Sequence, residues 1–251
     1  MPYISNKGYR TYYYSKGQGK PIVFIHGYLG SAKSHWGDQI FNPSLQAQFQ
    51  LIAPDLRGFG RSNTKIVESH PTSKIIQDLR ILITQELQLI DKPILVGYSV
   101  GAGLILKYTL LWPEDVKGLL LLSPRPFIGE TTRAWSPLSK EKRSGKKKSS
   151  FSSKIWTIVK ILQNQMTLFD TKIQLRRSKD YLTKISEIQQ PILLLYGNRD
   201  TVNPRLSFNV LRDFLPPHAK IGVFPADHGI SHEHPRAFNK VLTEFCHSTF
   251  S

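Results

Sequence analysis

Short apolar runs recur along this chain, and most of them are separated by segments in which apolar residues follow helical spacing. The runs are short and rich in branched residues, as strands buried on both faces are: 22–25, 51–53, 94–96, 118–122, 192–196 and 221–224. The intervening segments repeat apolar residues three or four positions apart: 75–89, 100–111, 206–214 and 235–245. This alternation predicts right-handed βαβ units and an α/β fold with a mostly parallel sheet covered by helices on both faces.

One interval breaks the alternation. Residues 124–186 hold no clear strand-like run, so we interpret them as a cap inserted into a core made of residues 1–123 and 187–251. Within the cap, residues 139–153 are rich in Lys, Ser and Gly, a composition that packs poorly and predicts a basic loop. Apolar residues at helical spacing across 155–169 predict an amphipathic cap helix.

The charge balance favours anionic partners. The chain has 34 Lys and Arg against 18 Asp and Glu, a formal net charge of +16, and such a field attracts nucleic acids and acidic membranes. The basic regions show no zinc spacing, recognition-helix pattern or aromatic sheet motif of a nucleic-acid-binding protein. Positive charge is then the only feature that would favour nucleic acid, so we do not expect nucleic acid as a partner. The basic loop is either a solvated loop or makes weak contact with an anionic lipid or membrane surface.

The chain shows no feature of an exported or membrane-spanning protein. The first ten residues contain basic residues without the apolar segment of a secretory signal. The most apolar stretch, residues 93–106, is too short to cross a bilayer. Cys246 is the single cysteine, so no intrachain disulfide can form. We therefore expect a cytoplasmic protein.

A Gly-x-Ser-x-Gly pattern stands between a predicted strand and a predicted helix. It runs from Gly97 through Ser99 to Gly101, directly after the strand 94–96. A chain that turns sharply there needs residues without a Cβ on both sides of the serine, and the turn presents the hydroxyl at the end of the strand. The helix N-terminus also favours negative charge that develops beside the serine. The alternative is a glycine-rich turn with an unreactive serine.

This pattern, together with two others, resembles the α/β-hydrolase fold family. Residues 26–30, His-Gly-Tyr-Leu-Gly, follow the strand 22–25, and residues 55–62 match the family's structural Asp-x-x-Gly-x-Gly-x-Ser turn. The resemblance covers nearly the whole chain and implies an eight-stranded type of sheet with an inserted helical cap. It also implies that Ser99 is the nucleophile and that the backbone N–H groups of Tyr28 and Val100 form the oxyanion hole.

The resemblance assigns the two remaining catalytic positions. Asp200 follows the strand 192–196, where the family carries its triad acid, although by itself it would be interpreted as a capping or turn residue. Among the histidines of the last loop, His228 follows the strand most closely and is the expected base. The others are expected to be exposed or to begin the last helix: His232 and His234. Asp227 stands where the family more often has Gly, and it could raise the pKa of His228 or compete for its proton. His26 is expected to be structural.

These residues predict a serine hydrolase that acts on a small-molecule ester or related acyl substrate through an acyl-enzyme. A serine nucleophile argues against the dehalogenase and epoxide hydrolase branches. Two alternatives stay open: a C–C bond hydrolase or lyase, similar to the menaquinone-pathway lyases and supported by Arg125 with Arg133, and a receptor with little turnover. No cofactor and no metal are expected.

Several apolar side chains are expected to line the substrate pocket: Leu29, Trp36, Phe127 and Trp135. They would favour an apolar acyl group. The alternative is that they pack the cap onto the core.

Overall fold

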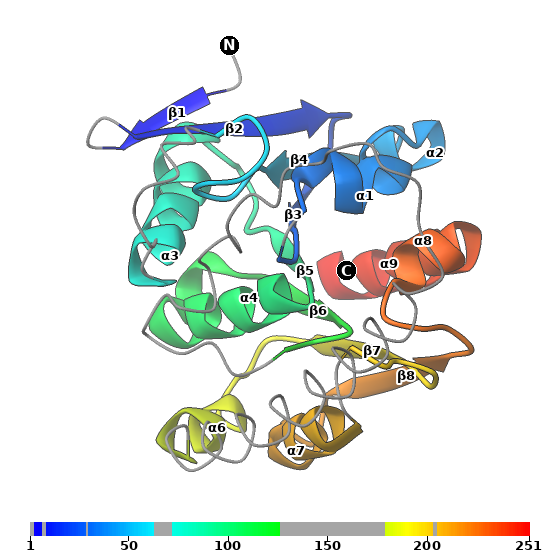
Figure 1. Ribbon diagram of the computed structural model, residues 1–251. Coiled ribbons are helices and arrows are strands. Elements are labelled where there is room, and N and C mark those ends of the chain that lie inside the picture. Colours follow the sequence, from blue (N-terminus) through cyan, green and yellow to red (C-terminus); the bar gives the residue numbers. More distant parts are fainter. Residues whose placement is uncertain (1–2, 7–8, 29, 63–71, 126–178, 203–204) are drawn as a thin grey trace, which may run out of the picture.

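The computed structural model describes residues 3–6, 9–28, 30–62, 72–125, 179–202 and 205–251, and these ranges form one eight-stranded sheet (Figure 1). The strands are β1 (Tyr3–Asn6), β2 (Tyr9–Lys16), β3 (Lys20–Ile25), β4 (Phe49–Pro54), β5 (Ile94–Tyr98), β6 (Gly118–Leu122), β7 (Ile192–Gly197) and β8 (Lys220–Phe224). Their spatial order is β1-β2-β4-β3-β5-β6-β7-β8. Strand β2 pairs antiparallel with β1 and β4, and all other pairs are parallel.

Helices cover both faces of this sheet (Figure 1). One face carries α1 (Ala32–Ile40), α2 (Pro43–Gln46), α8 (Ile230–Glu233) and α9 (Pro235–Phe250). The other carries α3 (Thr72–Ile81), α4 (Val100–Leu111), α6 (Lys179–Ile185) and α7 (Arg205–Phe214). A π-helical turn, η1 (Leu82–Glu86), continues α3, and a 3₁₀ turn, η2 (Pro113–Asp115), precedes β6. The predicted mostly parallel α/β sheet is confirmed.

Alternation of side chains along each strand explains the two layers of core. In β3, Ile22 and Phe24 pack on the α1 and α9 side, whereas Val23 and Ile25 pack on the α3 and α4 side. All four side chains are fully buried. Strands enclosed in this way read as continuous apolar runs, which is why the sequence reveals them.

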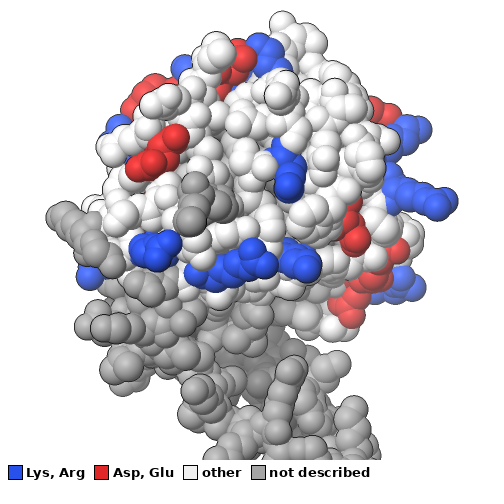
Figure 2. All heavy atoms as spheres, turned by 90° about the horizontal axis from the view of Figure 1, so that it is seen from above, with Lys and Arg blue, Asp and Glu red and all other residues white. Residues whose placement is uncertain are grey.

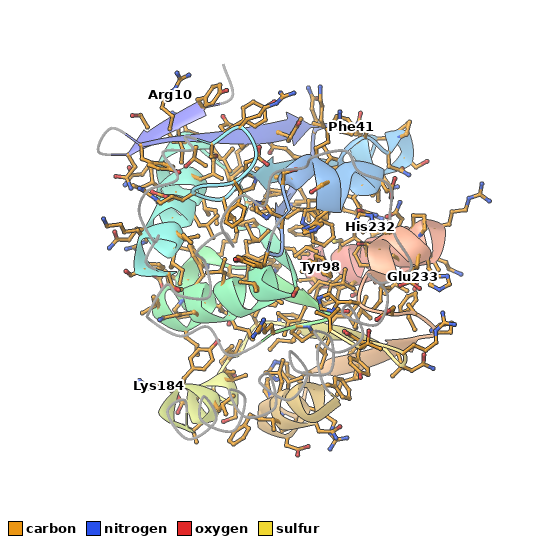
Figure 3. All side chains as sticks on the ribbon, in the orientation of Figure 1. Arg10, Phe41, Tyr98, Lys184, His232 and Glu233 are labelled. Carbon is orange, nitrogen blue, oxygen red and sulfur yellow. The ribbon has the colours of Figure 1, made fainter. Side chains whose placement is uncertain are left out.

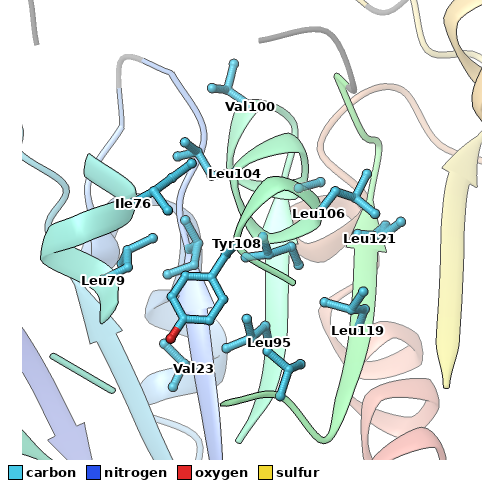
Figure 4. Packing of buried hydrophobic residues seen from close by; sticks show 14 of the residues in the cluster. Val23, Ile76, Leu79, Leu95, Val100, Leu104, Leu106, Tyr108, Leu119 and Leu121 are labelled. Carbon is cyan, nitrogen blue, oxygen red and sulfur yellow. The ribbon is translucent and has the colours of Figure 1, made fainter. Parts of the chain in front are cut away.

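Helix α4 occupies the centre of one core layer (Figure 4). Its Leu104 and Tyr108 pack among side chains of α3 and of the central strands, including Ile76 and Leu95. Tyr108 is fully buried, and its hydroxyl donates to Asp115 Oδ2 at 3.0 Å. Removing a buried leucine from such a layer typically costs about 2 to 5 kcal/mol of stability. The central strands and α4 therefore form a rigid platform under the residues that follow β5.

The structure extends or corrects several predicted elements. The predicted helix 75–89 is α3, which ends at Ile81 and is followed by the π-helical turn to Glu86. Strands β1 and β2 and helix α1 were not predicted from the sequence, and α9 continues to Phe250. These elements lack the continuous apolar runs or the complete periodic pattern on which the prediction relied.

The predicted cap lies mostly outside the described residues, as do its basic loop and its predicted helix. Helix α6 falls within the range 124–186 that was assigned to the cap. Its Leu182 and Ile185 are buried in the same core layer as α4, so this helix packs on the sheet. The cap itself stays a prediction.

The surface carries basic side chains outside the predicted basic loop as well. Viewed from the side of β1 and β2, several Lys and Arg side chains lie in a row (Figure 2). A membrane-crossing helix needs a long apolar stretch, and none of the helices within the described ranges has one.

Candidate active site

Ser99 lies at a strained turn between β5 and α4. Its backbone has φ of 55° and ψ of −114°, and residues other than glycine rarely adopt such a positive φ. A Cβ on Gly97 would lie 2.6 Å from the backbone of Ala102, and one on Gly101 would lie 2.3 Å from the carbonyl oxygen of Ile25. Both glycines are therefore needed for the close approach of strand and helix, as the pattern predicts.

Backbone hydrogen bonds fix Ser99 against its neighbours. Its N–H donates to the Leu122 carbonyl at 2.9 Å, and its own carbonyl accepts from Arg125 N–H at 3.0 Å. The residue is 8% exposed. The serine thus lies at the carboxyl end of the sheet, where parallel α/β folds bind their ligands.

Asp200 and His228 form a short hydrogen bond above the ends of β7 and β8. His228 Nδ1 lies 2.7 Å from Asp200 Oδ2, and the Asp200 side chain is fully buried. Asp200 Oδ1 accepts from Val202 N–H at 2.9 Å. A carboxylate at this distance binds the Nδ1–H tautomer of the imidazole, which leaves the Nε2 lone pair free to accept a proton.

A hydrogen-bond network joins the two loops that carry this pair. Asp227 Oδ1 accepts from the N–H groups of Thr201, at 3.0 Å, and His228, at 2.8 Å. Glu233 Oε1 accepts from the N–H of Asp227 at 3.0 Å, and Glu233 Oε2 lies 3.8 Å from Arg199 Nη2. The N–H bonds lower the pKa of Asp227 although burial opposes them. Asp227, which departs from the family pattern, thus directs its carboxylate at backbone donors.

The turn after β3 lies beside Ser99. A Cβ on Gly27 would lie 3.3 Å from Ser99 Cβ, so the turn that carries Tyr28 N–H approaches the serine closely. Within the turn, His26 is fully buried; its Nδ1 contacts Gly27 O at 2.8 Å and its Nε2 accepts from Leu56 N–H at 2.9 Å. Burial lowers the pKa of His26 to about 4. His26 therefore joins the turns after β3 and β4, a structural contact.

Residues 55–62 form a second anchored turn. Asp55 Oδ1 accepts from Ala32 N–H at 2.7 Å, and its Oδ2 accepts from Arg61 N–H at 2.7 Å. Ser62 Oγ donates to Asp55 O at 2.5 Å and accepts from Tyr12 N–H at 2.9 Å. This turn ties β4 to the start of α1 and to β2, and its contacts are structural.

The Tyr98 ring packs against the acid–base pair and against helix α1. Its centroid is 5.1 Å from that of His228 and 4.9 Å from that of His35. Figure 3 labels Tyr98 together with His232 and Glu233 of α8. Among the described residues, Ser99 Oγ makes no direct hydrogen bond to His228. Such bonds often form only when substrate binds.

A family model described as the alpha/beta hydrolase fold matches residues 20–144, about half of the chain. The chain belongs to the α/β-hydrolase fold family. A relative from Bacillus subtilis (strain 168), the AB hydrolase superfamily protein YisY, is 26% identical across 92% of this chain and 93% of its own length. A 2-hydroxy-6-oxo-6-phenylhexa-2,4-dienoate hydrolase from Burkholderia cepacia is 23% identical across 96% of this chain and 94% of its own.

Solved structures agree with this assignment at the level of the fold. The structure of Est816, described as an N-acyl homoserine lactone degrading enzyme, has a TM-score of 0.69 and 24% identity, over 97% of this chain and 100% of that chain. Identity this low supports the α/β-hydrolase fold alone. The recognition of the family from its turns is confirmed.

The expectation that Trp36 lines the pocket is wrong. Its ring is completely buried, with its centroid 5.1 Å from that of Phe24, 6.1 Å from that of Phe238 and 6.3 Å from that of Tyr98. Its position on the inner face of α1 was not foreseen because the sequence pattern did not reveal that helix. The other predicted pocket residues lie outside the described ranges: Leu29, Phe127 and Trp135.

His35 was missed by the sequence analysis. It projects from α1, and its Nδ1 accepts from Gly27 N–H at 3.1 Å. Its sequence position, directly before Trp36 and shortly after the His-Gly motif, gave only a weak local signal. Without the placement of α1, the sequence does not show that His35 contacts Gly27.

Among the described residues, no group of three or more His, Cys, Asp or Glu is arranged to hold a metal ion.

Proposed function

We propose that this protein is a serine hydrolase that cleaves a carboxylic ester or a related acyl substrate through an acyl-enzyme. The observation that carries the proposal is the strained Ser99 turn beside Gly27. The chain also contains a hydrogen-bonded Asp200–His228 pair, in which Asp200 favours the Nδ1–H tautomer that lets Nε2 act as a base. A backbone strained at a nucleophile position is characteristic of functional sites. The family assignment supports a hydrolase.

In the proposed mechanism, Ser99 Oγ attacks the acyl carbon while His228 Nε2 accepts the hydroxyl proton. Asp200 keeps the proton on Nδ1 and stabilises the imidazolium. His228 then returns its proton to the leaving alkoxide, and an acyl-enzyme forms. A water molecule, deprotonated by His228, attacks the acyl-enzyme and releases the acid and free Ser99.

The proposed oxyanion hole consists of the N–H groups of Tyr28 and Val100. Val100 opens α4, whose first N–H groups have no partner within the helix, and Tyr28 follows the Gly27 that approaches Ser99. Each such donor typically lowers the barrier by about 3 kcal/mol.

The decisive experiment compares hydrolysis of p-nitrophenyl esters of increasing chain length by the wild type and Ser99→Ala. We expect the wild type to hydrolyse at least one ester and the variant to lose at least about 10³-fold of kcat. Ser248→Ala is the matched control, because Ser248 is an exposed serine on α9. It should keep wild-type activity.

Two outcomes would contradict the proposal. Equal rates in the wild type and Ser99→Ala would exclude Ser99 as the nucleophile. Release of one equivalent of p-nitrophenol without further turnover would favour a receptor that uses the hydrolase fold.

A second candidate function is hydrolysis or elimination at a C–C bond in an anionic substrate. One relative over nearly its full length is a dienoate hydrolase, whose name specifies a carboxylate substrate. Arg125 follows β6 and is half-buried, and its backbone N–H donates to the Ser99 carbonyl. Among the described residues, no carboxylate forms an ion pair with its side chain. Turnover of a 2-hydroxy-6-oxo-dienoate faster than of any ester would favour this function.

A further inference from the structure

His35 lies on a helix whose start is anchored independently of the turn after β3. Ser31 caps α1 by accepting from Ser34 N–H at 3.1 Å, and the Ser34 side chain accepts from Ser31 N–H at 2.7 Å. Asp55 accepts from the N–H of Ala32. These bonds fix the helix, so His35 projects from a rigid support.

From this support, the His35 ring contacts the turn at both ends. Its Nδ1 accepts from Gly27 N–H at 3.1 Å. A Cβ on Gly30 would lie 2.1 Å from the ring, so Gly30 packs directly against it. The bond to Gly27 requires an unprotonated Nδ1, which places the proton of neutral His35 on Nε2.

The surroundings of the ring keep it neutral. The Tyr98 ring packs edge-on against His35, with 4.9 Å between the ring centroids, and the centroids of His26 and His232 each lie 6.1 Å from that of His35. Behind His232, Asp38 Oδ2 lies 3.6 Å from His232 Nδ1. Burial, together with repulsion from any positive charge on His26, His232 or His228, lowers the pKa of His35 to about 4. Near neutral pH the ring is therefore an acceptor toward Gly27.

We propose that His35 is a positioning residue for the oxyanion hole: its Nδ1 holds Gly27 N–H and thereby orients the next N–H, that of Tyr28, toward the acyl oxygen at Ser99. The proposal rests on the proposed serine-hydrolase function. His35 acts through the backbone of the turn and forms no bond with the reacting atoms.

A matched pair of variants separates this role from simple packing. In His35→Asn the Oδ1 atom is bonded to Cγ, as Nδ1 is in histidine, and can accept from Gly27 N–H. His35→Leu has nearly the same shape as asparagine but no acceptor. We expect His35→Leu to lower kcat about 10- to 100-fold with KM within about twofold, because part of one oxyanion donor is lost. His35→Asn should recover most of kcat.

A second readout does not depend on activity. Amide hydrogen exchange measured by NMR should be at least about tenfold faster at Gly27 and Tyr28 in His35→Leu than in the wild type and His35→Asn. The imidazole ¹⁵N shifts of wild-type His35 should report the Nε2–H tautomer at neutral pH. His247→Leu is the control, because His247 is exposed on α9, bonds Gln48 and should leave exchange in the turn unchanged.

Three results would overturn the inference: equal losses of kcat in the asparagine and leucine variants, wild-type kcat in His35→Leu, or unchanged exchange at Gly27 in His35→Leu. If wild-type protein shows no Ser99-dependent turnover, the proposed function fails. The exchange experiment then decides separately whether His35 fixes the turn.

Discussion

The Ser99 turn and the loops that carry Asp200 and His228 differ in the side-chain contacts that hold them in place. The Ser99 turn lies at the centre of the sheet, where Gly97 and Gly101 let backbone pack against backbone. The loops after β7 and β8 lie at the edge of the sheet, and side-chain carboxylates join them. Close backbone packing and backbone hydrogen bonds occur in both regions, as at Gly197 beside Asp227 O, but only the loops of the acid–base pair add a network of side-chain carboxylates.

This difference predicts how each region responds to substitution. A change in close backbone packing displaces α4, which contributes to the core, and so affects folding. A change in the edge loops leaves the core layers intact and affects the orientation of His228. Stability and activity should therefore separate between the two regions.

The largest effect on stability is expected for Gly101→Ala. The new methyl group would lie 2.3 Å from the Ile25 carbonyl oxygen, which is backbone and cannot move without the sheet. We expect a loss of about 3 kcal/mol or more in the free energy of unfolding, measured by urea denaturation. Gly37→Ala is the control, because its Cβ meets nothing within 4 Å and a helical alanine should stabilise by up to about 1 kcal/mol. Equal stability in both variants would show that the turn is not sterically fixed.

Asp200→Asn should affect activity far more than folding. An amide at this position binds the wrong tautomer of His228, and we expect kcat for the best ester to fall by about 10⁴-fold. The thermal unfolding midpoint should stay near that of the wild type, since the side chain keeps its volume. Asp213→Asn, on the exposed surface of α7, should change neither quantity. A parallel loss of stability and activity in Asp200→Asn would contradict the separation.

Glu233→Ala should have the smallest effect of the three. It removes the acceptor for Asp227 N–H and the partner of Arg199, but the bonds from Asp227 to Thr201 and His228 persist. We expect a three- to tenfold loss of kcat in steady-state ester hydrolysis, because His228 is held less firmly. Glu244→Ala, an exposed glutamate on α9, is the comparison and should leave kcat unchanged. An unchanged kcat in Glu233→Ala would mean that this network does not position the base.

The sequence predicted the parts of the fold whose signals are local. Continuous apolar runs identify the buried parallel strands because both of their faces are covered, and β6 has the predicted bounds. The glycines around Ser99 are readable because a sharp strand–helix turn excludes a Cβ. The pairing of Asp200 with His228 was expected from the family resemblance, and the structure brings the two side chains together.

Features that depend on long-range contacts were not readable. Helix α1 has a weak pattern because it is short and its buried face includes the polar Gln39 beside Trp36 and Ile40. Without this helix, Trp36 was expected in the pocket. Strand β2 was missed as part of the sheet, where it pairs with β4 about 40 residues away. The contact between His35 and Gly27 likewise required the placement of a helix.

The sequence by itself therefore determined the order of the central strands and of the helices between them, the α/β class and the turn at Ser99, because these follow from local patterns of burial and backbone conformation. The tertiary structure decided which side chains meet at the carboxyl ends of the strands. It buried Trp36, turned Asp227 toward backbone N–H groups and brought His35 to Gly27. Those contacts depend on how separate elements pack, and no local pattern in the chain records the distance between them.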